Sequence, residues 1–309
     1  MKCLKCCKSI NSGDFHPKCA QAVFGQRHPP RLDTTMDELE RMGQLLVSHH
    51  VALTGVQRKL SLDLEQRSPE RFTIVGALGG NYILKPPSAQ FPELPENEHV
   101  TMMMATQLGI RTATNSLIRM ADNRLAYITR RFDRTNTGKI AVEDLCQLTE
   151  TLTENKYRSS HERVGKYIAR YSTIPGDDLL RYFELTALCF LTGNADMHLK
   201  NFAMVEDARD FVLSPAFDLL STRLVLPESV DAEEMALTVN GKRAKITRKD
   251  MLKFASGLGI PDIVAVKTLN RLATGVHGCG PMLEESFLTP DSRQKYLDLI
   301  QSRAARIAT

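Results

Sequence analysis

Apolar and polar positions change their spacing near residue 132. Before that point, short runs alternate in polarity or are rich in β-branched and aromatic residues, which is typical of strands. The predicted strands cover residues 59–64, 71–75, 81–84, 115–119 and 125–130. Beyond it, the chain consists mostly of longer segments punctuated by Gly or Pro, which favours helices. The pattern predicts an α+β fold in which a small antiparallel sheet precedes a mainly helical part.

The predicted helices begin and end at residues that favour helix boundaries. Residues 35–50 carry apolar side chains at three-and-four spacing, with acidic residues near the start. Residues 96–108 lie between Pro95 and Gly109, the usual order of proline first and glycine last. Further helices are predicted over residues 160–170, 177–193, 248–257, 263–274 and 291–308. Residues 222–234 fit either an activation-segment loop or an ordered connector.

Three regions follow from this pattern. Residues 1–24 form a short cysteine-rich head, and Pro29-Pro30 reads as a connector because proline interrupts both helix and interior strand. Residues 25–132 form the predicted N-lobe, and residues 133–309 form the predicted C-lobe. This order suggests a bilobal, protein-kinase-like fold, although a fold alone does not establish a function.

Composition says more about the size and the cellular compartment of the protein than about its reaction. A chain of 309 residues with 42% hydrophobic residues is long enough for about two domains, and its net charge of +4 singles out neither nucleic acid nor a membrane surface. No apolar run is long enough to span a membrane, and the N-terminus lacks the apolar segment of a signal peptide. Four of the seven cysteines fall within the first nineteen residues, which argues for reduced thiols. We therefore expect a cytoplasmic protein without a membrane partner.

A polar turn after a strongly apolar helix carries the clearest chemical signal. In the run 191–202 (LTGNADMHLKNF), Asp196 and Asn201 have the five-residue separation of a kinase catalytic loop. Asp196 can accept the proton of a substrate hydroxyl, and Asn201 can bind a metal ion. The alternative is an ordinary turn rich in Asn and Asp.

A second acidic position follows seventeen residues after Asn201. Asp218 stands between apolar residues in the run 214–221 (SPAFDLLS), where burying an unpaired carboxylate is costly. A bound magnesium ion removes that cost, because magnesium prefers hard oxygen ligands. Asp218 could instead cap the following helical turn.

The N-lobe offers a cation and a loop for phosphates. Lys85 follows a β run and can project from the sheet, and Glu98 on the next helix is its candidate partner. The alternatives are that Lys85 is an ordinary solvated lysine and that Glu98 is an exposed charge on its helix. The run 53–60 (LTGVQRKL) can cover phosphates with backbone N–H groups, although its single glycine makes a weak phosphate-loop signal.

Taken together, these motifs resemble the HipA-type serine/threonine kinases, the toxin components of bacterial toxin–antitoxin systems. The motifs that carry the resemblance are TGVQRKL (54–60), YILKP (82–86), ENEH (96–99), RRFDR (130–134), EDLCQ (143–147), NADMHLKNF (194–202) and FDLLS (217–221). MALTVNG at 235–241 extends the match. Each motif is weak alone, and the ordered combination is specific.

The resemblance implies a role for each matching residue, with ATP and Mg²⁺ as cofactors. Lys85 would hold ATP phosphates, while backbone groups around Arg130 and Phe132 would bind adenine. Asp196 would be the catalytic carboxylate, with Asn201 and Asp218 as magnesium ligands. The remaining nucleotide-site positions are Thr54, Gly55, Val56, Gln57, Lys59, His198 and Phe217, the last standing where family members can have Tyr.

The resemblance also implies a switch and partners. Family members can autophosphorylate a serine ahead of the loop glycine, and the candidates here are Ala52 and Thr54, so Thr54 would be the acceptor. A phosphate there would repel the ATP phosphates and favour an open loop. The chain lacks the N-terminal subdomain of full-length members, which implies a separate small partner protein, a DNA-binding antitoxin that alone contacts DNA, and a protein substrate such as an aminoacyl-tRNA synthetase.

The cysteine-rich head contains two pairs of metal-binding residues. Cys3 and Cys6 form one pair, His16 and Cys19 form the other, and each pair has two intervening residues. Four soft or borderline donors in two chelating pairs suit a structural, tetrahedral Zn²⁺ ion. Cys7 could substitute for Cys6, and loose reduced thiols are the alternative. Cys146, Cys189 and Cys279 read as small buried hydrophobic residues.

Three functions therefore compete. The first is an active protein kinase toxin, because Lys85, Asp196, Asn201 and Asp218 are all present. The second is a non-catalytic subunit of a DNA-binding antitoxin complex, in which the head and basic residues such as Lys2, Arg27 and Arg31 contact a partner or DNA. The third is a small-molecule phosphotransferase on the same scaffold.

Overall fold

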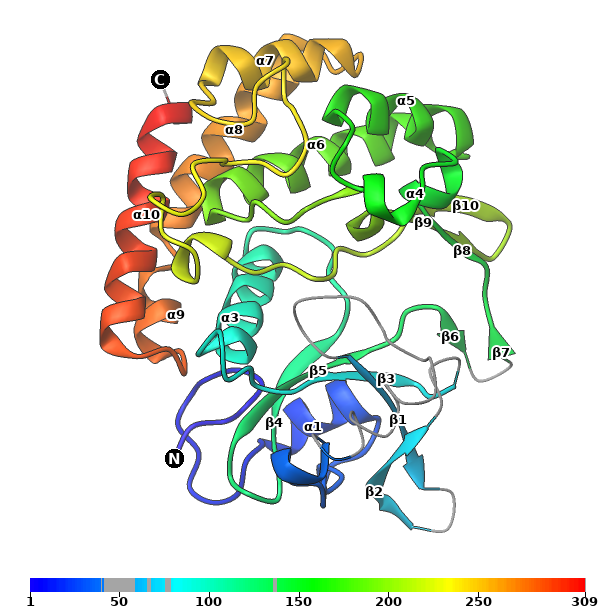
Figure 1. The fold of residues 1–309 in the computed structure, drawn as a ribbon, viewed down its shortest axis with the longest axis vertical. Coiled ribbons are helices and arrows are strands. Elements are labelled where there is room, and N and C mark those ends of the chain that lie inside the picture. The colour runs from blue at the N-terminus through cyan, green and yellow to red at the C-terminus, as the bar shows by residue number, and fades with distance from the viewer. Residues whose placement is uncertain (40, 42–58, 66–67, 76–78, 136–137, 309) are drawn as a thin grey trace. The chain divides into compact units, whose positions relative to one another are not determined.

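Five antiparallel strands form the main sheet of the protein (Figure 1). The structure, a computed structural model, describes residues 1–39, 41, 59–65, 68–75, 79–135 and 138–308. The strands are β1 (Leu60–Glu65), β2 (Ser68–Val75), β3 (Tyr82–Lys85), β4 (Asn115–Arg119) and β5 (Leu125–Arg130). Their order across the sheet is β2-β1-β3-β5-β4, which makes β3 the central strand.

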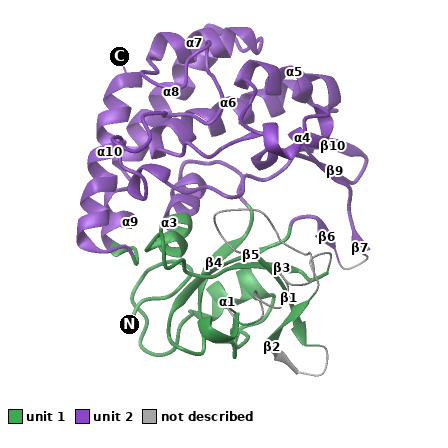
Figure 2. Cartoon of the chain, viewed as in Figure 1, with its two compact units in different colours: residues 1–99, 113–131, 285–287 green, residues 100–112, 132–284, 288–309 purple. Residues whose placement is uncertain are grey.

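The chain divides into two compact units (Figure 2). Unit 1 comprises residues 1–99, 113–131 and 285–287 and contains the five-stranded sheet. Unit 2 comprises residues 100–112, 132–284 and 288–309 and is mainly helical. The helix α3 (Leu94–Gln107) contributes to both, with its residues up to His99 in unit 1.

The cysteine-rich head is part of unit 1 and packs on the sheet. Its helix α1 (Pro17–Phe24) begins with a proline at the first turn and ends at Gly25, whose φ of 74° is the left-handed conformation that glycine adopts easily. Phe24 contacts Phe72 and Tyr82 of the sheet with ring centroids 5.9 and 6.2 Å apart. At the edge strand β4, the backbone N–H of Leu117 donates to the carbonyl of Leu4 over 3.2 Å. The head thus covers apolar side chains and one open backbone edge.

A long apolar helix forms the centre of unit 2. In α6 (Pro175–Thr192), eleven residues are buried, including the unbroken run 185–192. This second half of the helix is buried on all sides because neighbouring elements surround it. The other helices of this unit include α5 (His161–Tyr171), α7 (Arg248–Gly257), α8 (Asp262–His277) and α10 (Pro290–Ala308). Shorter ones are α4 (Leu145–Leu148) and α9 (Gly280–Glu285), the latter ending in unit 1.

Unit 2 also contains small sheets. The strands β8 (Val142–Asp144), β9 (Ala203–Asp207) and β10 (Asp210–Leu213) form an antiparallel sheet in the order β10-β9-β8. A separate hairpin joins β6 (Arg134–Thr135) to β7 (Gly138–Lys139). Sequence patterning did not predict these strands, because runs of two to five residues are too short to show a clear period.

The predicted α+β, kinase-like fold class is correct. All five predicted sheet strands form, and the predicted helices over residues 96–108, 160–170, 177–193, 248–257, 263–274 and 291–308 each correspond to a helix within a few residues. Of the predicted helix over residues 35–50, residues 36–39 and 41 are helical, and the rest lie outside the described residues. Within the described part of the chain, no helix has the length and apolar character needed to span a membrane.

Candidate functional site

Lys85 and Glu98 form a buried ion pair in unit 1. Lys85 ends the central strand β3, and its Nζ lies 2.6 Å from Oε1 of Glu98 on α3. The two side chains are 4% and 1% exposed. The ammonium also lies 5.4 Å from the ring centroid of Tyr127, the residue opposite Lys85 on β5. A buried lysine is rare without a partner, so the sheet and the helix hold this cation at a defined place.

The other predicted nucleotide residues of unit 1 fall at strand ends. Lys59 is exposed and directly precedes β1, where Leu60 pairs with Leu84 of β3. Arg130 is exposed at the end of β5, and its backbone N–H donates to the carbonyl of Thr114 over 2.7 Å. The predicted phosphate-loop residues Thr54, Gly55, Val56 and Gln57, together with Ala52, lie outside the described residues.

In unit 2, Gly193 ends α6 and starts the polar loop predicted to be catalytic. Its φ of 69° is left-handed, and a Cβ atom there would lie 2.7 Å from Cδ2 of Leu299. Only glycine satisfies both conditions without rearrangement. The buried guanidinium of Arg303 donates to the carbonyl of Phe190 over 2.6 Å and so satisfies the end of the helix. The loop therefore leaves α6 from a fixed point.

Asp196 and Asn201 are brought together by hydrogen bonds within this loop. The carbonyl of Asp196 accepts from Nδ2 of Asn201 over 2.9 Å and from the backbone N–H of His198 over 2.8 Å. The backbone N–H of Asp196 donates to Oδ1 of Asn194 over 3.0 Å. Because its amide nitrogen is occupied, Asn201 presents its Oδ1 as the atom that can bind a cation. Asp196 itself is half-buried.

Tyr157 is a site residue that the sequence analysis missed. Its hydroxyl donates to Oδ1 of Asp196 over 2.5 Å. Its ring meets the His198 ring edge-on, with centroids 5.0 Å apart at 79°. Burial, and then the hydrogen bond to Asp196, raise the pKa of this phenol above its usual value, so it remains a donor. The contact joins residues 39 positions apart, and no local spacing signals it.

His198 is a buried histidine of the same polar loop. It is 6% exposed, and its Nδ1 has no hydrogen-bond partner among the described residues. Burial lowers its pKa, Lys156 lowers it further, and the carboxylates of Asp196 and Asp218 act in the opposite direction. Both carboxylates, those of Asp196 and Asp218, therefore interact electrostatically with the His198 imidazole.

Asp218 and the aromatic residue before it have unusual placements. Asp218 has a φ of 60°, a left-handed conformation that aspartate tolerates better than most residues and that is frequent at functional sites. The Phe217 ring lies 5.5 Å from the Phe132 ring, so two predicted nucleotide-site residues meet within unit 2. The backbone N–H of Ala216 donates to the carbonyl of Arg111 over 2.8 Å and anchors this segment.

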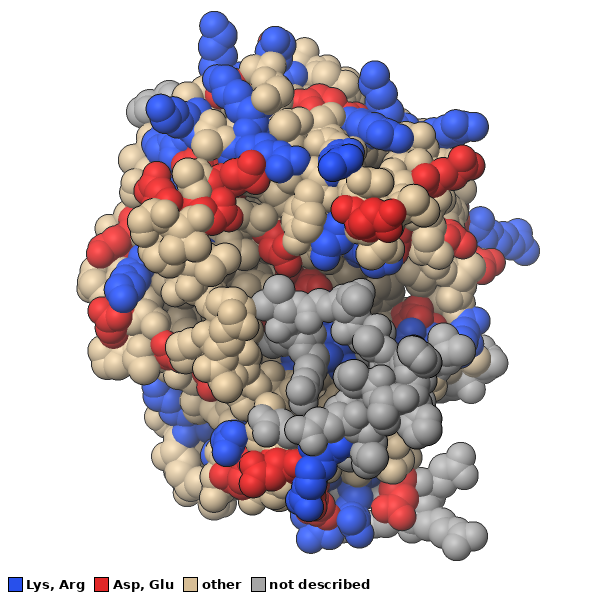
Figure 3. Space-filling model, in the orientation of Figure 1, with Lys and Arg blue, Asp and Glu red and all other residues tan. Residues whose placement is uncertain are grey.

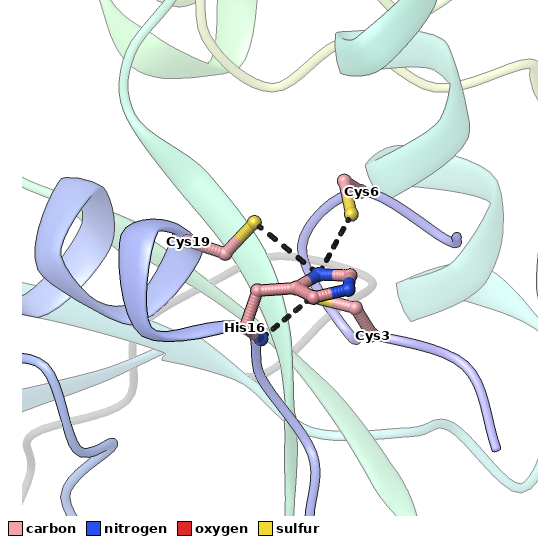
Figure 4. A group of neighbouring side chains, drawn as sticks. All are labelled: Cys3, Cys6, His16 and Cys19. Atoms are coloured by element: carbon pink, nitrogen blue, oxygen red, sulfur yellow. Dashed lines mark hydrogen bonds between the residues drawn. The ribbon is translucent and has the colours of Figure 1, made fainter. Parts of the chain in front are cut away.

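The head gathers its four predicted ligands. The Sγ atoms of Cys3, Cys6 and Cys19 and a ring nitrogen of His16 all lie within 4.8 Å of one another. Nδ1 of His16 is 3.4 Å from Sγ of Cys6 and 3.9 Å from Sγ of Cys19 (Figure 4). A tetrahedral zinc ion with Zn–S of about 2.3 Å and Zn–N of about 2.0 Å needs S···N separations of about 3.5 Å. The donor set therefore fits a zinc ion with little movement.

Hydrogen bonds around the cluster prepare it for a cation. Nε2 of His16 lies 3.1 Å from the carbonyl of Ser9, which favours the tautomer that leaves Nδ1 facing the thiols. Burial raises the pKa of Cys3, but backbone hydrogen bonds outweigh it and lower that pKa to about 7. Cys7 is buried outside the group of four, so the structure selects Cys6. Cys146, Cys189 and Cys279 are buried free thiols, as expected.

Charged side chains of both signs occur on the face shown in Figure 3. Acidic side chains lie among the lysines and arginines on the face shown in Figure 3. Direct DNA binding favours a continuous basic patch or stripe.

The fold and the candidate site together are those of a protein-kinase-like protein. A lysine on the central strand paired with a helix glutamate, and an Asp and Asn five residues apart in a loop, are the arrangement of the protein-kinase-like fold. The family model "HipA-like C-terminal domain" matches residues 51–278. The chain belongs to this family.

Several curated relatives support the family assignment. The chain is 30% identical over 250 residues to Putative kinase Y4mE and 28% identical over 231 residues to Putative kinase Y4dM, both of Sinorhizobium fredii. These matches cover 76% and 70% of this chain but only 58% and 56% of those proteins. The serine/threonine-protein kinase toxin HipA of Shewanella oneidensis is 25% identical over 248 residues, which cover 72% of this chain and 55% of that protein. The chain thus spans little more than half of each.

Solved structures confirm the fold. A chain from the complex of Shewanella oneidensis HipA with HipB and operator DNA aligns with a TM-score of 0.71 at 22% identity. The alignment covers 83% of this chain and 65% of that chain. The Helicobacter pylori kinase CtkA aligns with a TM-score of 0.51 at 16% identity, over 78% of this chain and 92% of that chain.

Proposed function

We propose that this protein is an ATP-dependent serine/threonine protein kinase that acts as a toxin. The observation that carries the proposal is the buried Lys85–Glu98 pair, because a kinase strand lysine must be held by a helix glutamate to meet the nucleotide phosphates. Stability alone does not explain a buried lysine at this position, because a buried ion pair adds little stability compared with apolar residues of similar size.

The residues of the unit 2 loop supply the remaining chemistry. Asp196 accepts the proton of the substrate hydroxyl, and the backbone hydrogen bonds around it hold its main chain in place. The amide oxygen of Asn201 and the carboxylate of Asp218 are hard donors of the kind that hold magnesium. When bound, the magnesium ion neutralises charge on the phosphates.

The nucleotide positions named by the family resemblance complete the proposal. Phe132 and Phe217, whose rings meet in unit 2, contact the adenine side, and Arg130 lies one residue before the boundary of unit 1. The buried Nδ1 of His198, which has no partner among the described residues, is free to donate to or accept from the nucleotide. Thr54, Gly55, Val56, Gln57 and Lys59 would cover the phosphates, with Thr54 as the autophosphorylation acceptor.

We further propose the partners of a toxin–antitoxin kinase. The related Shewanella protein is found with HipB and operator DNA. By analogy, a DNA-binding antitoxin would bind this chain, and DNA would be contacted through the antitoxin. A separate protein that corresponds to the N-terminal subdomain of other family members would be a further partner, as the family resemblance implies. The substrate would be a cellular protein such as an aminoacyl-tRNA synthetase. The free thiols suit the cytoplasm, where we place this activity.

The head would carry a structural zinc ion. Cys3, Cys6, His16 and Cys19 fill all four tetrahedral positions, so no coordination site remains for catalysis. The ion would hold together a head whose buried residues pack on the sheet of unit 1.

One experiment separates the candidate functions. The protein, ATP carrying a labelled γ-phosphate, and magnesium are incubated with a bacterial extract, in parallel with Asp196→Asn, and the labelled amino acids are identified. Phosphoserine or phosphothreonine that depends on Asp196 supports the proposal. Label in a small molecule alone would instead favour a metabolite phosphotransferase, and no label dependent on Asp196 would favour a non-catalytic subunit.

A further inference from the structure

The segment before α5 is held by hydrogen bonds to the catalytic loop and to Arg243, and Tyr157 is its central residue. The carbonyl of Lys156 accepts from the backbone N–H of Leu199 over 3.2 Å. The carbonyl of Tyr157 accepts a hydrogen bond from the guanidinium of Arg243. The side chain of Tyr157 then reaches Oδ1 of Asp196 over 2.5 Å. The backbone of this segment is thus fixed on both sides of the tyrosine.

The contact with Asp196 differs in kind from the others in the loop. Asn194, His198 and Asn201 all hold backbone atoms of Asp196. Tyr157 holds a carboxylate oxygen, the part of Asp196 that must meet a substrate hydroxyl. Without it, the carboxylate of a half-buried aspartate can rotate about its Cα–Cβ and Cβ–Cγ bonds.

We propose that Tyr157 is a positioning residue for the transfer reaction, whose hydroxyl fixes Oδ1 of Asp196 so that Oδ2 faces the substrate hydroxyl. This role rests on the proposed kinase function. Oδ2 of Asp196 makes no hydrogen bond among the residues that the structure describes, so it is the oxygen left for the incoming proton. The edge-on contact with His198 keeps the phenol ring from turning away.

Two charged groups act on the phenol in opposite directions. The Lys156 ammonium lies 5.1 Å from the centroid of the Tyr157 ring, and a cation there favours a phenolate. The phenol stays protonated because burial and the Asp196 carboxylate disfavour a phenolate. A phenolate could not donate and would repel the carboxylate, so the arrangement depends on the proton of Tyr157.

Tyr157→Phe removes the hydroxyl and keeps the ring. We expect kcat for labelled phosphate transfer to fall about 10- to 100-fold, with the KM for ATP unchanged, because a misplaced catalytic group affects the reaction step. Thermal unfolding should be unchanged, since Tyr157 is 37% exposed. The matched control is Tyr171→Phe on α5, whose ring stacks on Tyr167 and, within the part of the chain that the structure describes, has no ring contact with the loop.

Changing the acidity of the phenol at position 157 changes the pH dependence of kcat only if the hydroxyl proton takes part. A purely structural role of Tyr157 would leave that pH dependence unchanged. 3,5-Difluorotyrosine at position 157 retains the hydroxyl but ionises at lower pH than tyrosine, whose phenol usually titrates near pH 10. We expect near wild-type kcat below its ionisation and a fall in kcat as the pH rises through it, a limb that wild type lacks over the same range. Tyr157→Phe should be slow throughout.

The outcomes distinguish this proposal from the kinase assignment. If wild type transfers phosphate in an Asp196-dependent manner while Tyr157→Phe keeps full kcat, the positioning role is overturned and the kinase function stands. If the difluorotyrosine protein shows no new limb, the role of the proton is overturned. If wild type shows no Asp196-dependent transfer, the kinase function fails, and the role of Tyr157 fails with it.

Discussion

The Nζ of Lys85 lies 2.6 Å from Oε1 of Glu98, and both side chains are almost completely buried within unit 1. Each charge makes the burial of the other tolerable, so the pair acts as one element. Its members come from the central strand and from the helix that follows it, which fixes their spacing.

Glu98→Gln should impair catalysis much more than the substitution Glu96→Gln on the same helix. The variant leaves the buried Lys85 ammonium without its carboxylate, so kcat/KM for ATP should fall about 100-fold or more, and about 3 kcal/mol of stability should be lost. Steady-state kinetics and urea unfolding measure the two effects.

Glu96→Gln is the matched control for that substitution. Glu96 stands two residues earlier on the same helix, and burial raises its pKa to about 7, so glutamine resembles its protonated form. Its kcat/KM should stay within about threefold of wild type, a change below 1 kcal/mol. Equal losses in both variants would mean that the helix, rather than the Lys85–Glu98 pair, is being disturbed.

The purified protein should contain one equivalent of zinc, measured by elemental analysis. Cys19→Ser should lose it and unfold at a lower temperature, because four protein ligands make a closed structural site. Cys7→Ala removes a buried thiol outside the group of four and should retain the metal. Full zinc content in Cys19→Ser, or no zinc in wild type, would contradict the assignment.

The Asp250 carboxylate should make the free energy of unfolding of unit 2 depend on pH. Burial raises its pKa, but hydrogen bonds from Asn240, Lys242 and Thr247 outweigh this and hold the pKa well below its usual value. Its stabilisation is therefore complete above the unfolded pKa of about 3.9 and is lost as the pH falls toward the folded pKa. Asp250→Asn should cost about 3 kcal/mol at pH 7 and progressively less below about pH 4.

Chemical denaturation at several pH values measures this difference. The exposed Asp262, in the first turn of α8, provides the control Asp262→Asn, which should cost less than about 1 kcal/mol. A cost for Asp250→Asn that does not vary with pH would show that packing, and not the charge, carries the effect.

The sequence predicts elements whose signals are local. The start of α6 at a proline, its apolar run and its end at Gly193 are all visible in order, and so is the spacing of Asp196 and Asn201. The head ligands are likewise a local pattern, and the structure brings the four together. The burial of Lys85 depends on β5 and α3 together, so the sequence left a solvated lysine open.

Long-range contacts explain what the sequence does not predict. Strand β8 pairs with β9 some sixty residues later, and neither is long enough to show a period. Tyr157 reaches Asp196 across 39 positions, and its loop carries no motif that would have singled it out. Such contacts depend on how elements far apart in the sequence pack together, which local spacing does not show.

The most direct test of the kinase assignment is the rate of phosphate transfer from ATP to protein serine or threonine by wild type, Asp196→Asn and Asp262→Asn in one preparation series. A positioned base contributes about 100- to 10,000-fold, so Asp196→Asn should lose at least about two orders of magnitude while Asp262→Asn matches wild type. Equal rates in all three proteins, whether fast or absent, would contradict the kinase assignment.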